Sequence, residues 1–129
     1  MAIDRAGKIT LVKGDSYPES LNRELRFDDS RLASGSKWPI LTGAVMTLEI
    51  DDGAVEVTGR IVDGTSSTKT VAFSPTGSQT GLLDAGSYDY NVVASYPGTG
   101  TGTSDDDRVS LTGTWLDAAR KCIVYDRED

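Results

Sequence analysis

Acidic side chains are the residues whose spacing in this sequence could most readily support chemistry. They adjoin one another at Asp28-Asp29, at Asp51-Asp52 and in the run Asp105, Asp106 and Asp107. Paired carboxylates act as general acid and base only when both reach the reacting group, but neighbouring positions on a strand project to opposite faces. All three groups lie in turn-forming sequence, where Asp is favoured. We therefore interpret them as solvated loop acids.

The chain contains no histidine. This removes the commonest general base, the commonest zinc ligand and every Ser-His or Cys-His nucleophile pair. The run Asp105 to Asp107 lacks the ligand spacing of an EF-hand calcium loop. The Gly-Thr repeat at 98–103 matches neither a Walker loop nor a dinucleotide fingerprint. The sequence therefore predicts that the protein is not an enzyme and has no catalytic, metal-binding or cofactor-binding residues.

Three aromatic side chains offer a different chemistry, because Trp38, Tyr96 and Trp115 could stack on a sugar ring if they were exposed. Strand alternation instead assigns Tyr96 and Trp115 to core-facing sides. Trp38 therefore remains the aromatic candidate for an interaction surface, together with Asp105, Asp106 and Asp107. A carbohydrate-binding or adhesin-like module is the alternative function that this surface would serve.

The segment from Trp38 to Asp63 organises the rest of the fold as a β-hairpin. One side of its first strand carries Ala44, Met46, Leu48 and Ile50, and one side of its second carries Val55, Val57, Gly59 and Ile61. This period of two indicates strands with one buried face. Between them, Asp52-Gly53 favours the positive φ angles of a tight primed turn.

Shorter alternating segments follow the same period on both sides of the hairpin. We predict strands at Lys8 to Lys13, Leu21 to Phe27, Lys69 to Ser74, Tyr88 to Tyr96, a return strand containing Val109, Leu111, Gly113 and Trp115, and Ile123 to Tyr125. Pro97 to Asp107 is predicted to be the loop of a long hairpin. The segment Leu21 to Phe27 also fits a helix, because Leu21 and Leu25 are four residues apart, but its neighbours favour a strand.

These segments predict an all-β fold, specifically an antiparallel immunoglobulin-like β-sandwich of seven or eight strands. We expect a single domain over residues 1–129, with an ordered core from about residue 8 to residue 125. The lone cysteine, Cys122, cannot form an internal disulfide, and we expect it to be a buried apolar side chain.

The overall composition also excludes some partners. A formal net charge of −7 argues against nucleic acid, since phosphate binding requires a basic surface. No apolar run approaches the ~20 residues of a membrane-spanning helix, and the first residues lack the apolar segment of a signal peptide. We expect neither membrane insertion nor secretion.

Four short motifs, taken in their order along the chain, resemble a known family. They are Gly14-Asp15, Leu41-Thr42-Gly43-Ala44, the segment Thr80 to Tyr90, and Leu111-Thr112-Gly113-Thr114-Trp115. Over about residues 8 to 116 this order is similar to the immunoglobulin-like domain at the N-terminus of tailed-phage upper baseplate proteins and in related short phage and prophage tail proteins. The segment before Tyr88 is also compatible with a tyrosine corner, in which its hydroxyl bonds to the backbone.

The resemblance implies a structural role and carries no catalytic residues. It implies a tail or baseplate module in the virion, made in the bacterial cytoplasm, that docks to other tail subunits or to copies of itself. The chain departs from the family in its loop from Asp28 to Lys37, in its Gly-Thr repeat and in ending soon after the domain. We therefore expect it to act alone or as an adaptor, without a long host-binding region.

Overall fold

Strands form most of the regular structure. The computed structural model describes residues 8–28, 38–96, 107–111 and 121–126. Within these residues the elements in chain order are β1 (Ile9–Val12), the 3-10 turn η1 (Glu19–Leu21), β2 (Leu25–Asp28), β3 (Val45–Ile50), β4 (Val55–Asp63), β5 (Thr70–Phe73), the one-turn helix α1 (Gly77–Thr80), β6 (Gly86–Tyr96), β7 (Asp107–Ser110) and β8 (Lys121–Tyr125). The prediction of an all-β fold is confirmed for this part of the chain.

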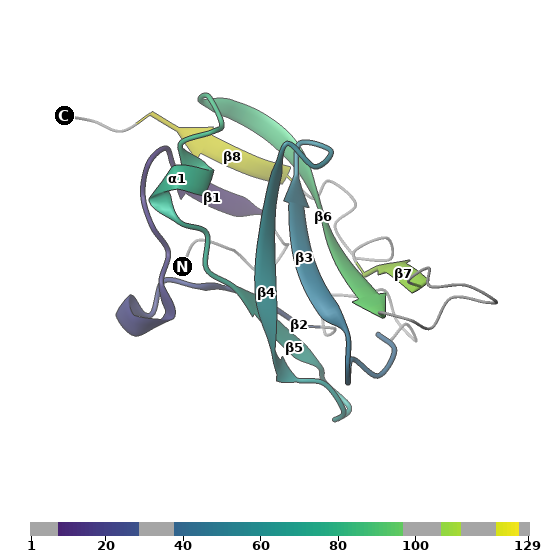
Figure 1. The fold of residues 1–129 in the computed structure, drawn as a ribbon. Helices are drawn as coiled ribbons and strands as arrows, with labels where there is room; N and C mark the ends of the chain where they lie inside the picture. Colours follow the sequence, from purple (N-terminus) through teal and green to yellow (C-terminus); the bar gives the residue numbers. More distant parts are fainter. Residues whose placement is uncertain (1–7, 29–37, 97–106, 112–120, 127–129) are drawn as a thin grey trace.

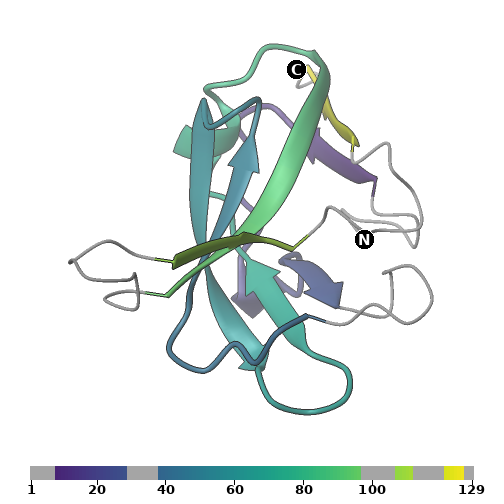
Figure 2. The same cartoon turned by 90° about the vertical axis from the view of Figure 1, so that its right-hand side faces the viewer.

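The strands pair into one curled, mixed sheet. Their hydrogen-bonded order is β1-β8-β6-β3-β4-β5-β2, and β7 pairs with the end of β6. Residues 86–89 of β6 pair with β8, whereas residues 90–95 pair with β3. In β4, residues 55–58 pair with β3 and residues from 59 onward pair with β5. Because both long strands change partners, the sheet curls and brings β1 and β2 across the interior from β3 and β4 (Figure 1; Figure 2).

The hydrophobic core fills the interior of this curl, and the alternation seen in the sequence explains its membership. Buried side chains include Ile9, Leu11, Leu25, Phe27, Met46, Leu48, Ile50, Val55, Val57, Val71, Phe73, Tyr90, Val92, Ala94, Cys122 and Val124. The Phe27 ring packs edge-on against Phe73, with centroids 5.6 Å apart, and tilted against Tyr90 at 5.8 Å. These rings hold β2, β5 and β6 together.

The turn between β3 and β4 has the predicted conformation. Asp52 has a φ of 55° and Gly53 a φ of 91°, and the Ala54 N–H donates to the Asp51 carbonyl at 3.1 Å. Asp51 also has a positive φ, of 56°. Two central residues with positive φ match the twist of the flanking strands, which is why this turn type closes hairpins.

The predicted strand from Leu21 to Phe27 is wrong in its first half. β2 begins at Leu25, and the residues before it form the turn η1, where the Leu21 N–H lies 3.3 Å from the Pro18 carbonyl. Asn22 then adopts the left-handed region with a φ of 57°. The side chain of Leu21 is 68% exposed. The turn that follows Pro18 therefore sets the conformation of Leu21, although the alternating pattern predicts a strand there.

The helix α1 has no counterpart in the predictions. Its first turn carries a capping box, because the Thr76 hydroxyl accepts from the Gln79 N–H at 3.2 Å and the Gln79 side chain accepts from the Thr76 N–H at 2.9 Å. A threonine followed three residues later by glutamine is the sequence signature of this motif. The signal was therefore present in the sequence.

The expectation of a purely antiparallel sheet is corrected at one edge. β1 runs parallel to β8, with Ile9 opposite Cys122 and Val12 opposite Tyr125. Parallel strands cannot be joined by a tight hairpin, and these two strands come from opposite ends of the described chain. Sequence alternation gives the faces of a strand but not its direction relative to a distant partner.

The remaining strand predictions agree with the structure where it describes them. β1, β5 and β8 fall within or close to the predicted segments, and β6 pairs with β7 as a hairpin. Leu111, predicted to face inward on the return strand, is 3% exposed, but β7 ends one residue before it and begins at Asp107, which was predicted to end the loop. Gly113, Trp115 and residues 97–106 of the predicted loop lie outside the described residues.

Cys122 is fully buried on β8, as expected. Burial away from water disfavours the charged thiolate and raises the pKa of this thiol to about 12. Reactive cysteines have the opposite character, with a depressed pKa and access to solvent. Cys122 is therefore a packing residue.

Candidate functional site

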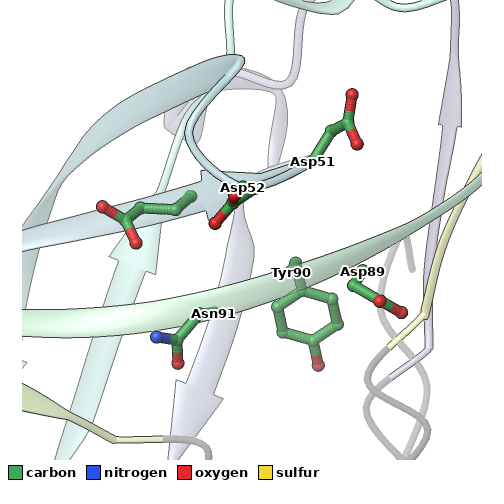
Figure 3. Close-up of a pocket in the computed structure, with 6 residues that line it drawn as sticks. Asp51, Asp52, Asp89, Tyr90 and Asn91 are labelled. Atoms are coloured by element: carbon green, nitrogen blue, oxygen red, sulfur yellow. The ribbon is translucent and has the colours of Figure 1, made fainter.

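A surface hollow lies beside the β3–β4 turn, where the turn meets β6 (Figure 3). Its volume is about 320 Å³. We call it the acidic hollow, and it is lined by Glu49, Asp51, Asp52, Asp89, Tyr90 and Asn91. Four of these six residues are acids, so the hollow is a place among the described residues where ionisable side chains could support chemistry.

Backbone pairing positions these side chains. The Asp51 N–H donates to the Asp89 carbonyl at 2.9 Å, which fastens the turn to β6. Glu49 stands opposite Asn91 in the β3–β6 register. Tyr90 is 3% exposed and packs in the core, and it also contributes to the lining of the hollow. The acids thus come from a rigid strand pair and its turn.

Like and opposite charges both lie on this face of the described residues. Glu49 lies directly opposite Glu56 on β4, and like charges in that position repel. At the rim, the Lys121 ammonium lies 2.6 Å from a carboxylate oxygen of Asp89. This lysine therefore offsets the charge of Asp89 at the rim of the hollow.

The carboxylates do not converge on one point. Figure 3 shows those of Asp51, Asp52 and Asp89 directed in three different directions. Among the described residues, no group of three or more His, Cys, Asp or Glu side chains is arranged to hold a metal ion. Asp51 and Asp52 are exposed, which agrees with their interpretation as solvated turn acids. The hollow can present negative charge, but its geometry does not position an acid and a base on one substrate atom.

The position of Trp38 contradicts its assignment to an exposed interaction surface. The residue is 4% exposed and belongs to the core cluster. Its indole N–H donates to the Leu111 carbonyl at 2.8 Å, across 73 residues of sequence. A buried indole needs such a partner, and Leu111 supplies it because the end of the β6–β7 hairpin packs over the start of the central hairpin.

The other predicted site residues are largely beyond the described structure. Asp105 and Asp106 lie outside the described residues. Asp107 begins β7, where its backbone is opposite Tyr96. Tyr96 packs partly buried against the core, as predicted, and its hydroxyl donates to the Ile40 carbonyl at 2.8 Å. Burial raises the pKa of the Tyr96 hydroxyl. Trp115 lies outside the described residues.

Sequence reasoning missed Glu49, Asp89 and Asn91 as members of one site. Alternation assigns each of them to the outward side of its strand. Only the β3–β6 pairing, between segments about 40 residues apart in sequence, brings them together. The alternation of residues shows which side chains share a face of one strand. The pairing of that strand with another shows which side chains of the two strands become neighbours.

A second group of polar contacts fixes the corner before β6. The Tyr88 hydroxyl donates to the Asp84 carbonyl at 2.6 Å, which is the hydrogen bond expected of a tyrosine corner. The Lys13 ammonium lies 2.8 Å from the Asp84 carboxylate. The hydrogen bond between the Lys13 ammonium and the Asp84 carboxylate raises the pKa of Lys13 and lowers the pKa of Asp84.

The same corner is attached to the turn after β1. Thr80 is 1% exposed, and its hydroxyl donates to the Asp15 carbonyl at 2.8 Å and accepts from the Gly14 N–H at 3.0 Å. All of these residues stabilise a connection, and none points into the acidic hollow. Their role is structural.

Comparison of the chain with protein-family models, with curated proteins and with solved structures finds no match. The functional interpretation therefore depends on the geometry and on the sequence motifs. In the described ranges, no helix is both long and apolar enough to cross a membrane.

Proposed function

We propose that this chain is a non-enzymatic structural module of a phage or prophage tail or baseplate. In this role it docks to other tail subunits, or to further copies of itself, within the virion. The proposal combines an immunoglobulin-like interpretation of the fold with the order of the four sequence motifs. A fold by itself does not specify a function, so the motifs carry the assignment to a tail.

Strand pairing supports the immunoglobulin-like interpretation. In immunoglobulin sandwiches the second, fifth and fourth strands pair in one sheet, and the third, sixth and seventh pair in the other. Here β2-β5-β4 and β3-β6-β8 are the corresponding runs of neighbours. The long strands β4 and β6, which change partners along their length, join what would be separate sheets in that architecture.

The observation that carries the proposal is the hydrogen bond from the Tyr88 hydroxyl to the Asp84 carbonyl. Both residues belong to the longest of the four motifs, Thr80 to Tyr90. A tyrosine corner at the start of the sixth strand is a hallmark of immunoglobulin-like domains. The motif that suggested the family therefore forms the local structure that the family would require.

The geometry also supports a docking role over a chemical one. The carboxylates of the acidic hollow diverge, whereas an acidic surface on a rigid strand pair suits recognition of a basic partner. Docking through the β1 edge is disfavoured, because the Val12 N–H donates to the Tyr17 hydroxyl at 2.7 Å and the Val12 carbonyl accepts from the Asp15 N–H at 3.0 Å. We expect contacts through loops and other edges.

Purified particles of the phage or induced prophage that encodes the chain provide the test. Mass spectrometry of gradient-purified particles should detect the chain in a fixed ratio to known tail proteins, and immunogold microscopy should label the tail or baseplate. Chemical cross-linking of the same particles should join the chain to a tail subunit. Absence of the chain from purified particles would refute the virion role.

A glycan array distinguishes the carbohydrate-binding alternative. Burial of Trp38 removes the side chain on which that alternative chiefly relied. We expect no specific glycan binding and no change in tryptophan fluorescence on addition of sugars. Saturable binding of one glycan class would favour the alternative instead.

A further inference from the structure

The described chain contains two Asp-Gly pairs in contrasting surroundings, Asp52-Gly53 and Asp63-Gly64. At such a pair the backbone nitrogen of glycine can attack the side-chain carboxyl carbon of aspartate. A C–N bond forms, water leaves, and a five-membered succinimide results. Hydrolysis adds water back at either carbonyl and yields aspartate or isoaspartate. Glycine permits the attack most readily because it has no Cβ.

The carboxylate of Asp63 is held away from this reaction. One oxygen accepts from the N–H groups of Thr65, at 3.2 Å, and Ser66, at 3.1 Å, and the other accepts from the Ser66 hydroxyl at 2.6 Å. These bonds lower the pKa of Asp63. Ring closure requires a neutral carboxyl that is free to rotate toward the Gly64 nitrogen, and the three bonds oppose both requirements.

The backbone of Gly64 is also confined. Its carbonyl accepts from the Leu41 N–H at 3.0 Å. A Cβ placed on Gly64 would lie 3.1 Å from a methyl carbon of Ile61. The rearrangement that a succinimide demands at residues 63 and 64 would therefore disturb packed neighbours.

The Asp52-Gly53 pair lies within a hydrogen-bonded turn, where the Ala54 N–H donates to the Asp51 carbonyl at 3.1 Å, but its own side chain and its glycine lack these restraints. Asp52 is exposed at the tip of the β3–β4 turn, and within the described part of the chain its carboxylate accepts no hydrogen bond. A Cβ on Gly53 would meet no heavy atom within 4 Å. Figure 3 shows the Asp52 side chain projecting from the turn, and Asp52 is one of the residues that line the acidic hollow. The Asp52 carboxyl is therefore exposed to water, and the space beside Gly53 is open.

We propose that Asp52-Gly53 is a site of spontaneous modification, at which folded protein converts aspartate to isoaspartate through a succinimide while Asp63-Gly64 is protected. The conversion routes the backbone at residue 52 through the former side-chain carbonyl, which adds one methylene carbon to the chain and leaves the α-carboxylate as the free side group. It therefore alters the turn that sets the register of the central hairpin and borders the acidic hollow. This inference is independent of the proposed function.

Incubation of the intact folded chain at physiological temperature and mildly acidic pH tests the proposal. Peptide mapping with electron-transfer fragmentation distinguishes isoaspartate from aspartate at each position. We expect the rate at Asp52 to exceed that at Asp63 by about tenfold or more, which corresponds to about 1.4 kcal/mol in the barrier. Equal rates in the folded protein, or a faster rate at Asp63, would overturn the proposal.

Two variants and one denatured control separate structure from sequence. Asp52→Glu should abolish the product at residue 52, because a six-membered ring closes far more slowly. Ser66→Ala should raise the rate at Asp63 and leave the rate at Asp52 unchanged. In concentrated urea the wild-type chain should react at similar rates at both pairs, and this comparison does not depend on whether Ser66→Ala folds. A preserved difference in urea would show that local sequence, and not the fold, sets the rates.

Discussion

At the scale of single residues, Glu24 is a charged side chain that folding buries almost completely. Only 5% of the side chain is exposed, and both carboxylate oxygens accept from one guanidinium nitrogen of Arg60, at 2.8 and 2.9 Å. The bonds connect the start of β2 to β4 across the intervening strand β5. Loss of such a partner leaves a buried carboxylate uncompensated and lowers the free energy of unfolding.

We expect Glu24→Gln to lower the free energy of unfolding by about 1.5 to 3 kcal/mol, the range for hydrogen bonds to charged groups. Urea denaturation measures it. Glu19→Gln is the matched control, because Glu19 lies 3.2 Å from the same Arg60 nitrogen but is 65% exposed. An exposed pair contributes less than about 1 kcal/mol. Equal losses in the two variants would contradict the role assigned to burial.

Cys122 gives a pH dependence whose sign follows from its environment. Burial raises the pKa of its thiol to about 12 in the folded state, against about 8.5 in an unfolded chain. The folded state therefore retains a proton that the unfolded state loses. The contribution to stability is complete below about pH 8.5 and is lost progressively as the pH rises toward 12.

Comparison of wild type with Cys122→Ala isolates this effect from other groups that titrate at high pH. The wild-type advantage in free energy of unfolding should shrink as the pH rises above about 8.5. Urea denaturation over a series of alkaline buffers measures the difference. An advantage that stays constant over that series would show that the thiol is not protected from solvent in the way the structure indicates.

At the scale of elements, the corner before β6 depends on one phenolic hydroxyl. Tyr88→Phe removes the bond to the Asp84 carbonyl and should lower the free energy of unfolding by about 1 kcal/mol. Thermal and urea denaturation both report it. Tyr125→Phe is the control, since that side chain is 51% exposed. A comparable loss in the control would argue against a tyrosine corner that stabilises the fold.

The elements also show which features a sequence can predict. The β3–β4 hairpin depends on contacts near in sequence, and both its alternation and its Asp52-Gly53 turn were predicted. The capping box of α1 is equally local, but this helix was not predicted from the sequence. By contrast, the parallel pairing of β1 with β8 and the bond from Trp38 to Leu111 join distant segments. The alternation of residues within one segment does not show in which direction a distant strand will pair with it. Nor does it show which residue will accept the hydrogen bond of the Trp38 indole.

The candidate site follows the same division. The exposed positions of Asp51 and Asp52 could be predicted, because turn chemistry is local. Their proximity to Glu49, Asp89 and Asn91 could not, because it depends on the long-range pairing of β3 with β6. The sequence therefore predicts that the turn presents exposed acids, but it does not predict which residues of other strands lie beside them.

At the scale of the whole molecule, stability depends on the hydrophobic core enclosed by the curled sheet. Val57 is 2% exposed and belongs to that interior. Val57→Asp should destabilise the protein by several kcal/mol, because an unpaired carboxylate would be buried. Thr58→Asp, at the neighbouring outward position, should change the free energy of unfolding by less than about 1 kcal/mol. Thermal melts that ranked the two variants in reverse would contradict the assignment of the two faces.

The parallel pairing of β1 with β8 also determines how the molecule responds to mechanical load. Because Ile9 and Tyr125 lie at opposite ends of this pair, tension applied through them slides one strand along the other and loads every bond of the ladder together. Tension applied through Val12 and Tyr125, which lie opposite each other, would break the bonds one after another. We expect single-molecule pulling to require more force in the first geometry, so that the molecule resists stretching along its length better than peeling from one end.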